Sequence, residues 1–391
     1  MKKLLISFVL VFTMLLSIGM VAFAYDATVT DETGFTDALG NTDSEITITL
    51  AGDIDAGWLE IPEGKKVTIK GEGTLNCEGV DVCGTLLLGA NVNIVSEEGV
   101  AVAGTFNMSG GSVTVIDDVY AVDIASGASF VLSGGTVSGG SIATVRVNTS
   151  GVGGSSGGNA SFEMSGGNVT NATTGVESKG NLEISGGSVS GGKTGVQVGA
   201  NSNATTEISG GSVSGGETGV QVGSNNLGET KITGTSSISG NTTGLEIGSL
   251  SVVTMSGGAV KSSNGDSVVN NGGFTMSGGS VEATNGNGVV NNGYFTMEGG
   301  SVEAAKVGVS NEGNGNFTMT DGFVKGDEVS VKDNGANQSQ LNGGTVYVYT
   351  PPVANPYNVP STADNSNMPL WSVLFIAFAA IAIISGKKRR A

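Results

Sequence analysis

An eight-residue unit, apolar–x–apolar–Ser–Gly–Gly–x–Val, recurs through most of the chain and constrains its fold more than any other feature. Residues 106–113 are a complete copy, and most copies follow one another after 20 to 24 residues. Repeats of this period are typical of solenoids, in which each repeat packs on its neighbours. The Ser position of the unit is occupied by Ser109, Ser133, Ser165, Ser185, Ser209, Thr233, Ser256, Ser277, Glu298, Thr320 and Asn342.

Within one repeat the apolar residues alternate with polar ones, as β-strands require. In residues 274–277, Phe274 and Met276 share one face, and we expect Gly-Gly to break the strand and turn the chain. Residues 280–283 and 288–291 are two further short strands. Three strands and three turns in about 22 residues predict one coil of a right-handed parallel β-helix, with about thirteen coils in all. Leucine-rich, calcium-binding nonapeptide and helical repeats fit less well, because their own patterns are missing here.

The register of the repeats predicts which side chains stack inside the solenoid. Coils should rise by about 4.8 Å each, which gives a rod of roughly 60 Å. Asn270 and Asn291, which lie 21 residues apart, could stack as an amide ladder at a turn. One interior column should contain Met108, Leu132, Met164, Ile184, Ile208, Ile232, Met255, Met276, Met297, Met319 and Leu341.

The start of the solenoid needs a cap, because an open end exposes unpaired strand edges. Residues 33–39 predict a short helix with Thr33 as its N-cap, within a capping region 25–45, and residues 46–50 and 67–69 predict irregular first coils. In architecture, residues 27–350 resemble pectate-lyase-like β-helix proteins. The glycine-rich repeat by itself identifies no single family.

Residues 1–24 have the pattern of a secretory signal peptide. A charged start is followed by an apolar stretch, and Ala22 and Ala24 precede an expected cut that leaves Tyr25 as the first mature residue. At the other end, residues 351–369 predict a proline-rich linker. Residues 370–386 predict a transmembrane helix, and the basic residues 387–391 predict a cytoplasmic tail.

This C-terminal arrangement resembles the cell-wall sorting signal of Gram-positive surface proteins, in which the motif reads Leu-Pro-any-Thr-Gly. The resemblance covers roughly the last 35 residues and implies that a sortase-like transpeptidase joins Thr362 to cell-wall peptide. Val359 replaces the family's leucine and Ala363 its glycine, so a variant sortase, or retention by the apolar helix alone, are the alternatives. The matching residues are Val359, Pro360, Ser361, Thr362 and Ala363.

Composition limits the chemistry that the chain can perform. It has no histidine, and Arg146 is the one arginine outside the C-terminal tail. The net charge is −18, and about −23 once the ends are processed. Nucleic acid is a poor partner for such an acidic surface, because phosphate binding relies on clustered Lys and Arg. Cys77 and Cys83 could form a disulfide after export, or could remain free buried thiols.

Polysaccharide-active enzymes on this fold need an arginine base with calcium-binding aspartates, or carboxylates at a defined separation. No aspartate cluster surrounds Arg146 in the sequence, and we expect it to form a surface ion pair. The local carboxylate pairs are better explained as solvated turn residues. These pairs are Asp53 with Asp55, Glu97 with Glu98, and Asp117 with Asp118.

An outward column next to the interior one contains Glu163, Glu183 and Glu207 on successive coils, followed by Lys231. Like charges stacked in this way are unfavourable, so Ca²⁺ could bind there weakly, although a screened and solvated face is the simpler interpretation. The same column continues as a line of threonines that could bind glycans or ice, or could reflect only the β-propensity of threonine. These threonines are Thr254, Thr275, Thr296 and Thr318.

The sequence therefore predicts a structural or adhesive rod without catalysis, tethered to the cell wall or membrane at the bacterial surface. Glycans or a host surface are the expected partners, and no cofactor is expected apart from Ca²⁺. The alternative is a polysaccharide-active lyase or hydrolase, or a dedicated carbohydrate-binding module.

Overall fold

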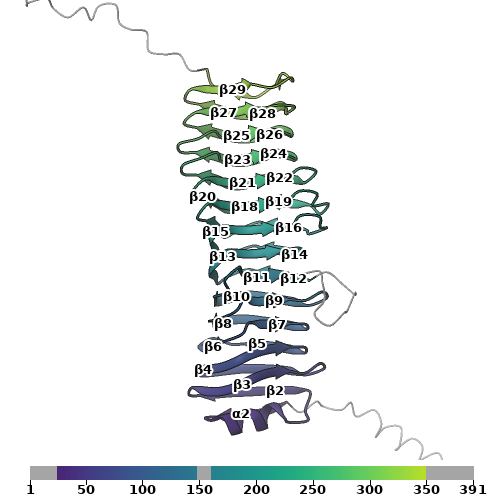
Figure 1. Ribbon diagram of the computed structural model, residues 1–391, viewed down its shortest axis with the longest axis vertical. Helices are drawn as coiled ribbons and strands as arrows, with labels where there is room; N and C mark the ends of the chain where they lie inside the picture. The colour runs from purple at the N-terminus through teal and green to yellow at the C-terminus, as the bar shows by residue number, and fades with distance from the viewer. Residues whose placement is uncertain (1–23, 148–159, 349–391) are drawn as a thin grey trace, which may run out of the picture. The chain divides into compact units, whose positions relative to one another are not determined.

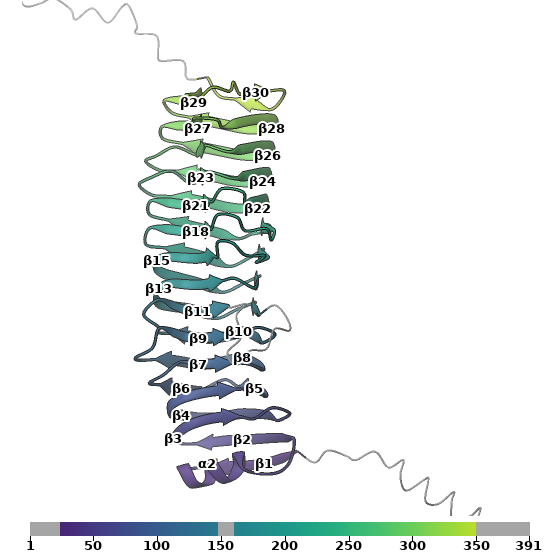
Figure 2. The same cartoon turned by 45° about the vertical axis from the view of Figure 1, so that its right-hand side comes forward.

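The computed structural model describes residues 24–147 and 160–348, which form a parallel β-solenoid of about 14 turns (Figure 1). The coils stack in chain order, from α2 and β1 at one end to β29 and β30 at the other (Figure 2). The predicted parallel β-helix is confirmed, with one turn more than the thirteen expected.

The first half of the described chain contains helix α2 and the first thirteen strands. Several strands are long, because they continue around a corner of the coil from one face to the next. The elements are β1 (Tyr25–Val29), α2 (Glu32–Leu39), β2 (Glu45–Ala51), β3 (Ile54–Ile61), β4 (Lys66–Val82), β5 (Thr85–Leu88), β6 (Val92–Ser96), β7 (Val100–Val102), β8 (Thr105–Val115), β9 (Tyr120–Ile124), β10 (Ser129–Ser138), β11 (Ala143–Val147), β12 (Ser161–Met164) and β13 (Asn168–Ser178).

The second half repeats the same three-strand coil with little variation. Its strands are β14 (Asn181–Ile184), β15 (Ser188–Val198), β16 (Thr206–Ile208), β17 (Ser212–Gly215), β18 (Thr218–Val222), β19 (Thr230–Ile232), β20 (Ser237–Gly240), β21 (Thr243–Ile247), β22 (Val252–Ser262), β23 (Val268–Asn270), β24 (Gly273–Ala283), β25 (Val289–Asn291), β26 (Tyr294–Ala304), β27 (Val307–Asn311), β28 (Asn316–Gly326), β29 (Val329–Asp333), β30 (Gln340–Leu341) and β31 (Thr345–Val346).

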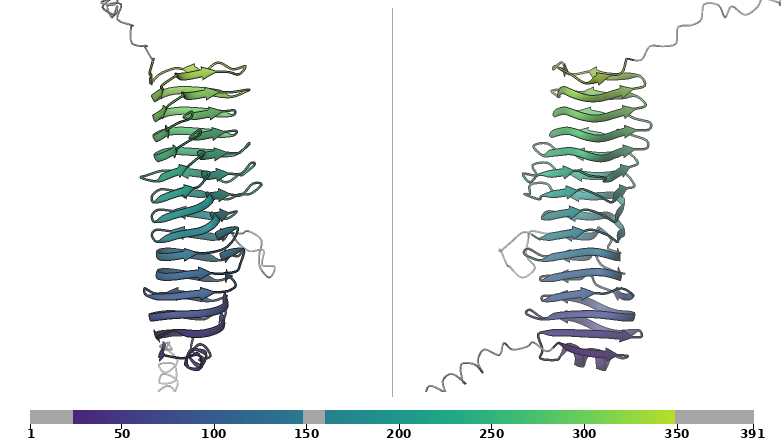
Figure 3. Two further views of the ribbon diagram at one scale, coloured as in Figure 1. Left: turned by 60° about the vertical axis from the view of Figure 1, so that its left-hand side comes forward. Right: turned by 180° about the vertical axis from the view of Figure 1, so that it is seen from behind.

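Parallel pairing between successive coils joins all the described strands, which stack along the solenoid (Figure 3). Because long strands turn the corners between faces, we name the three faces of the coil sheet 1, sheet 2 and sheet 3. Sheet 1 includes β12, β14, β16 and β19, and carries the first apolar residues of each repeat. Sheet 2 includes β17 and β20. Sheet 3 includes β7, β9 and β11, and its inward side chains are mostly valines.

The predicted interior column is confirmed. Pairing places Met108 beside Leu132, then Met164, and continues coil by coil to Met319 and Leu341. Every member is buried except Leu341, which is 47% exposed because it belongs to the last coil that the structure describes. Burial of these apolar side chains, at about 25 cal/mol per Å², drives the stacking.

A second interior column in sheet 1 consists of stacked phenylalanine rings that are interrupted in the middle. Rings at Phe106 and Phe130 lie 4.8 Å apart, centroid to centroid, and those at Phe274 and Phe295 lie 5.1 Å apart. Between the two stacks the column contains smaller residues, among them Thr206 and Thr230. Both threonines are buried, and their hydroxyls have no hydrogen-bond partner.

The Gly-Gly pair of the repeat turns the chain, and in some coils it separates two strands as predicted, for example between β12 and β13 and between β14 and β15. Other strands continue through the pair, some of them with local shifts in pairing register. These strands are β8, β10, β22, β24 and β26. Gly279 shows why the second position is glycine. Its φ is +83°, and an added Cβ would lie 2.7 Å from the carbonyl oxygen of Gly257 on the preceding coil. The pair therefore acts as a compact corner, which in these strands interrupts the backbone pairing only locally.

Helix α2 covers the N-terminal end of the solenoid, as expected. Its Phe35 and Ala38 are buried against the first coils. The N-cap is Asp31 and not Thr33, because Asp31 is extended and its Oδ1 accepts a hydrogen bond from the Gly34 amide at 2.8 Å. The helix consequently begins at Glu32.

The predicted amide ladder is confirmed and is longer than expected. The side-chain amide of Asn270 donates to Asn291 at 2.8 Å, and Asn291 donates to Asn311 at the same distance. Asn311 then reaches Asp333 at 3.3 Å. All three asparagines are fully buried, so the ladder satisfies polar groups inside three neighbouring coils.

Several predicted segments lie outside the described residues. These are the signal peptide up to residue 23, the linker and sorting-like motif at 351–369, the apolar segment 370–386 and the basic tail. Within residues 24–147 and 160–348, no helix is long and apolar enough to cross a membrane.

Candidate functional site

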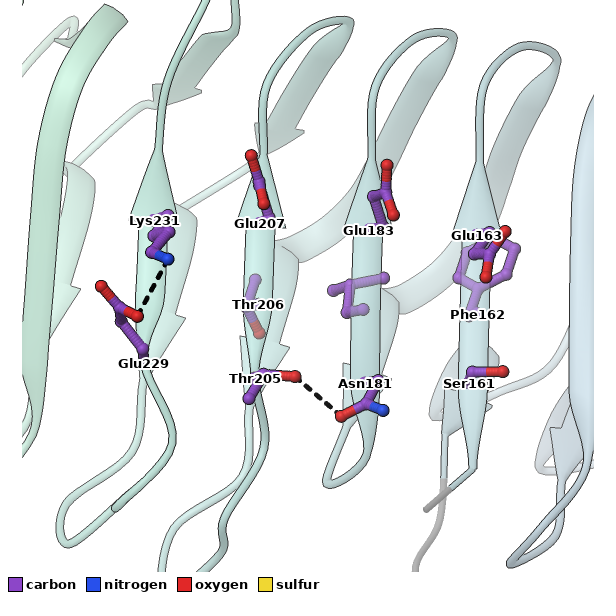
Figure 4. Close-up of a pocket in the computed structure, with 11 residues that line it drawn as sticks. Ser161, Phe162, Glu163, Asn181, Glu183, Thr205, Thr206, Glu207, Glu229 and Lys231 are labelled. Atoms are coloured by element: carbon purple, nitrogen blue, oxygen red, sulfur yellow. Dashed lines mark hydrogen bonds and ion pairs between the residues drawn. The ribbon is translucent and has the colours of Figure 1, made fainter. Parts of the chain in front are cut away.

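The outward face of sheet 1 brings together the glutamates singled out from the sequence. Glu163, Glu183 and Glu207 pair in register on successive strands, with Lys231 next in line, and each side chain lies over its own strand (Figure 4). The predicted register is confirmed. In the described part of the chain, no three acidic, Cys or His side chains are grouped so that they could hold a metal ion. The geometry therefore gives the calcium prediction no support.

The same glutamates border a shallow hollow of about 330 Å³. Beside them, the hydroxyl of Thr205 donates to Oδ1 of Asn181 at 2.7 Å, and Nζ of Lys231 lies 3.0 Å from a Glu229 carboxylate oxygen (Figure 4). The hydrogen bond with Glu229 and the charge of that carboxylate raise the pKa of Lys231, and the nearby Glu207 carboxylate adds to the effect. The hollow thus presents hydroxyl, amide and carboxylate groups to solvent, a set that suits a hydroxylated ligand.

The threonine column follows on the same face of sheet 1. Thr254, Thr275, Thr296 and Thr318 pair in register and are half-buried. They form a line of hydroxyls continuous with the glutamate column. The predicted hydroxyl face is present, and its role stays a prediction.

Arg146 forms the ion pair that the sequence predicted. Its Nε donates to Oδ1 of Asp123 at 2.7 Å, and its Nη2 binds the second carboxylate oxygen. The guanidinium also lies over the ring of Tyr120, 3.8 Å from the centroid. The hydrogen bond with Asp123 is the main cause that raises the pKa of Arg146 above its usual value. Arg146 is therefore fixed as a charged, structural group on sheet 3.

Sequence reasoning missed the groove to which Arg146 belongs. A hollow of about 370 Å³, here called the Trp58 groove, crosses β3, β4, β7, β9 and β11. Its lining includes Trp58, Asp81, Glu98, Ala101, Asp118 and Tyr120 together with the Asp123–Arg146 pair. Trp58 is 49% exposed, which is unusual for an indole. The signal that could have marked it is Trp58 itself, because its alternation with the buried Leu59 and Ile61 directs a large aromatic side chain outward.

The local carboxylate pairs behave mostly as turn residues, as predicted. Oδ1 of Asp53 accepts from the Thr74 amide at 2.8 Å, and Oδ1 of Asp55 accepts from the Asn76 side chain at 2.9 Å. Oδ2 of Asp118 accepts from the Gly99 amide at 2.8 Å. The remaining members, Glu97, Glu98 and Asp117, are exposed. Asp53, Asp55 and Asp118 thus link neighbouring coils.

The two cysteines are free, so the disulfide prediction is not supported. Cys77 points into the core and Cys83 lies exposed beyond the end of β4, so the two thiols face different environments. Burial raises the pKa of Cys77 to about 12. The pKa of Cys83 is also raised, first by its partial desolvation and then by the charges of Asp81, Glu60 and Glu63.

Comparison of the chain with protein-family models, curated proteins and solved structures found no match.

Proposed function

We propose that this chain is an exported rod, tethered to the bacterial envelope by its C-terminal segment, that acts in adhesion and does not perform catalysis. The observation that carries the proposal is the unbroken register of sheet 1, which continues from β2 to β30. A stack of about 14 turns spans about 65 Å at the spacing of parallel strands. Such a rod can hold a binding surface away from the point where it is attached.

The tether rests on the sorting-like motif around Thr362 and the apolar segment after it. In a Gram-positive host, we expect the chain in the covalent cell-wall fraction. Thr362→Ala should move it to the membrane fraction, because the acyl donor is lost. Ser361→Ala is the matched control, since that position of the motif accepts any residue. Quantitative blotting of the two fractions measures the shift.

Retention in the wall by Thr362→Ala would contradict attachment by a sortase. Release of the native chain into the medium would contradict tethering itself.

Glycan binding is a second candidate function, favoured by the hydroxyl, amide and carboxylate groups around the sheet 1 hollow. On a glycan array, we expect Asn181→Ala with Thr205→Val to reduce the signal of any bound glycan at least about tenfold, the size of one lost pair of ligand hydrogen bonds. Asn292→Ala, an exposed asparagine on a distant coil, is the control. New reducing ends or unsaturated products in the same incubations would favour the polysaccharide-active enzyme instead.

A further inference from the structure

The Trp58 groove already shows how it holds a cation. On one wall, the Arg146 guanidinium is bound by both oxygens of Asp123 and lies over the ring of Tyr120. An aromatic ring and a carboxylate thus share one guanidinium. This combination stabilises a planar cation through cation–π attraction and paired charge-assisted hydrogen bonds.

The opposite wall carries the same two chemical groups. The indole N–H of Trp58 donates to Oδ2 of Asp81 at 2.9 Å. The ring lies against Gly79, where an added Cβ would approach it to 2.7 Å, so backbone fixes one side while about half of the indole stays exposed. A carboxylate can accept about four hydrogen bonds, so Asp81 can hold Trp58 and a ligand at once.

Strand pairing between successive coils connects the two walls of the groove. Asp81, Ala101 and Asp123 occupy the same outward column on three successive coils. The two carboxylates are therefore about 10 Å apart along the solenoid, with only a methyl group between them. The small side chain of Ala101 leaves the floor of the groove low, and a flat group can enter.

The charge of the groove favours a cationic ligand. Among its described lining residues, four carboxylates, Asp81, Glu98, Asp118 and Asp123, face one guanidinium, Arg146, which leaves a net charge of −3. The negative charge extends beyond the groove, because Glu60 pairs with Asp81 on the neighbouring coil. Such a concave, acidic surface attracts cations and repels polyanions.

We propose that the Trp58 groove binds an arginine side chain of a basic polypeptide partner, with the guanidinium stacked on Trp58 and hydrogen-bonded to Asp81 and Glu98. This inference rests on the adhesive role proposed above and gives it a partner class. Arginine fits better than lysine, because its planar guanidinium stacks on an indole and bonds a carboxylate through two N–H groups. The Arg146 wall is the internal example of the same recognition.

The fluorescence emission of Trp58 can report binding in the groove. The chain has two tryptophans, so a full-length chain with Trp371→Phe leaves Trp58 as the only indole. Titration with hexa-arginine at fixed ionic strength should change Trp58 emission in a saturable way, and hexalysine should bind more weakly. Asp81→Asn and Glu98→Gln should each weaken hexa-arginine binding about tenfold, as expected for the loss of one charge-assisted pair.

Glu163→Gln removes an exposed carboxylate from sheet 1 and should change the affinity less than twofold. Glu98→Gln keeps the test valid if Asp81→Asn disturbs the Trp58 side chain, because Glu98 is exposed and the indole N–H donates to Asp81. An unsaturable change in emission, or equal weakening by Glu163→Gln, overturns the site. Binding of a chitosan oligosaccharide in place of hexa-arginine overturns the polypeptide partner.

The titration uses purified chain and is independent of where the protein resides in the cell. A negative titration with normal wall attachment would therefore reject the groove and leave the tether standing. Specific binding by a chain that is not attached to the envelope would reject the tether and keep the site.

Discussion

At the scale of single residues, the least favourable feature is a pair of hydroxyls in the core. Thr206 and Thr230 stand side by side in the column that phenylalanine occupies elsewhere, and each is at most 1% exposed. Neither hydroxyl has a hydrogen-bond partner. A buried, unpaired hydroxyl costs about 1–3 kcal/mol in proteins.

Thr206→Val should therefore stabilise the chain by about 1 kcal/mol, because valine has the same shape without the polar atom. The midpoint of urea unfolding, followed by circular dichroism, measures the change. Thr275→Val, in the half-buried outward column, is the control and should shift the midpoint little. A lower midpoint for Thr206→Val would show that the hydroxyl is satisfied in solution, for instance by a buried water.

The repeat predicts that Thr206 points into the core, but it does not predict that the hydroxyl has no hydrogen-bond partner there. The repeat places Thr206 inward because it aligns with Phe162 and Leu182. Whether a buried hydroxyl finds an acceptor depends on carbonyls from other coils and on loops of irregular length. Sequence spacing gives no distance between those atoms.

At the scale of elements, the amide ladder fastens the turns that follow β23, β25 and β27. Asn291 accepts from Asn270 and donates to Asn311 and to the Asn316 carbonyl. Its removal would leave the buried amide of Asn270 and the carbonyl of Asn316 each without one bond. A buried polar group that loses its hydrogen-bond partner costs the protein the free energy of its desolvation.

Asn291→Ala should destabilise the chain by about 3 kcal/mol. The adjacent Asn292→Ala is the matched control, because the Asn292 side chain is exposed and donates to the exposed Asn271, and it should change stability by less than about 0.5 kcal/mol. Thermal unfolding of both variants under one buffer condition makes the comparison. Equal effects of the two substitutions would show that the buried position of Asn291 in the ladder does not contribute to the stability of the chain.

This element was predictable because the asparagines recur at the coil period, so stacking followed from register alone. The corner at Gly-Gly was only half predicted. Glycine signals a turn, but the sequence does not say whether the hydrogen bonds on either side continue, and in β24 they do through a shift in register. The N-cap of α2 was missed because Asp31 and Thr33 are both good caps, and the path of the chain before the helix decides between them.

At the scale of the whole molecule, the repeat made the solenoid, its interior columns and the glutamate column predictable. The Trp58 groove was not, because Trp58 and Arg146 are 88 residues apart and belong to early coils in which the repeat is irregular. Only stacking brings them to one face. A site built from irregular coils leaves no periodic trace, so periodicity is a poor guide to function in this fold.

The backbone hydrogen bonds between coils run along the axis of the solenoid, and this has a mechanical consequence. A pull from the C-terminal end would load one coil's bonds at a time, in the manner of a zipper. Each coil released would add about 22 residues, or about 75 Å of extended chain. The first coils, closed by α2 and containing the Trp58 groove, would be the last to yield. A rod of this kind would lengthen in steps under load while the Trp58 groove stayed folded.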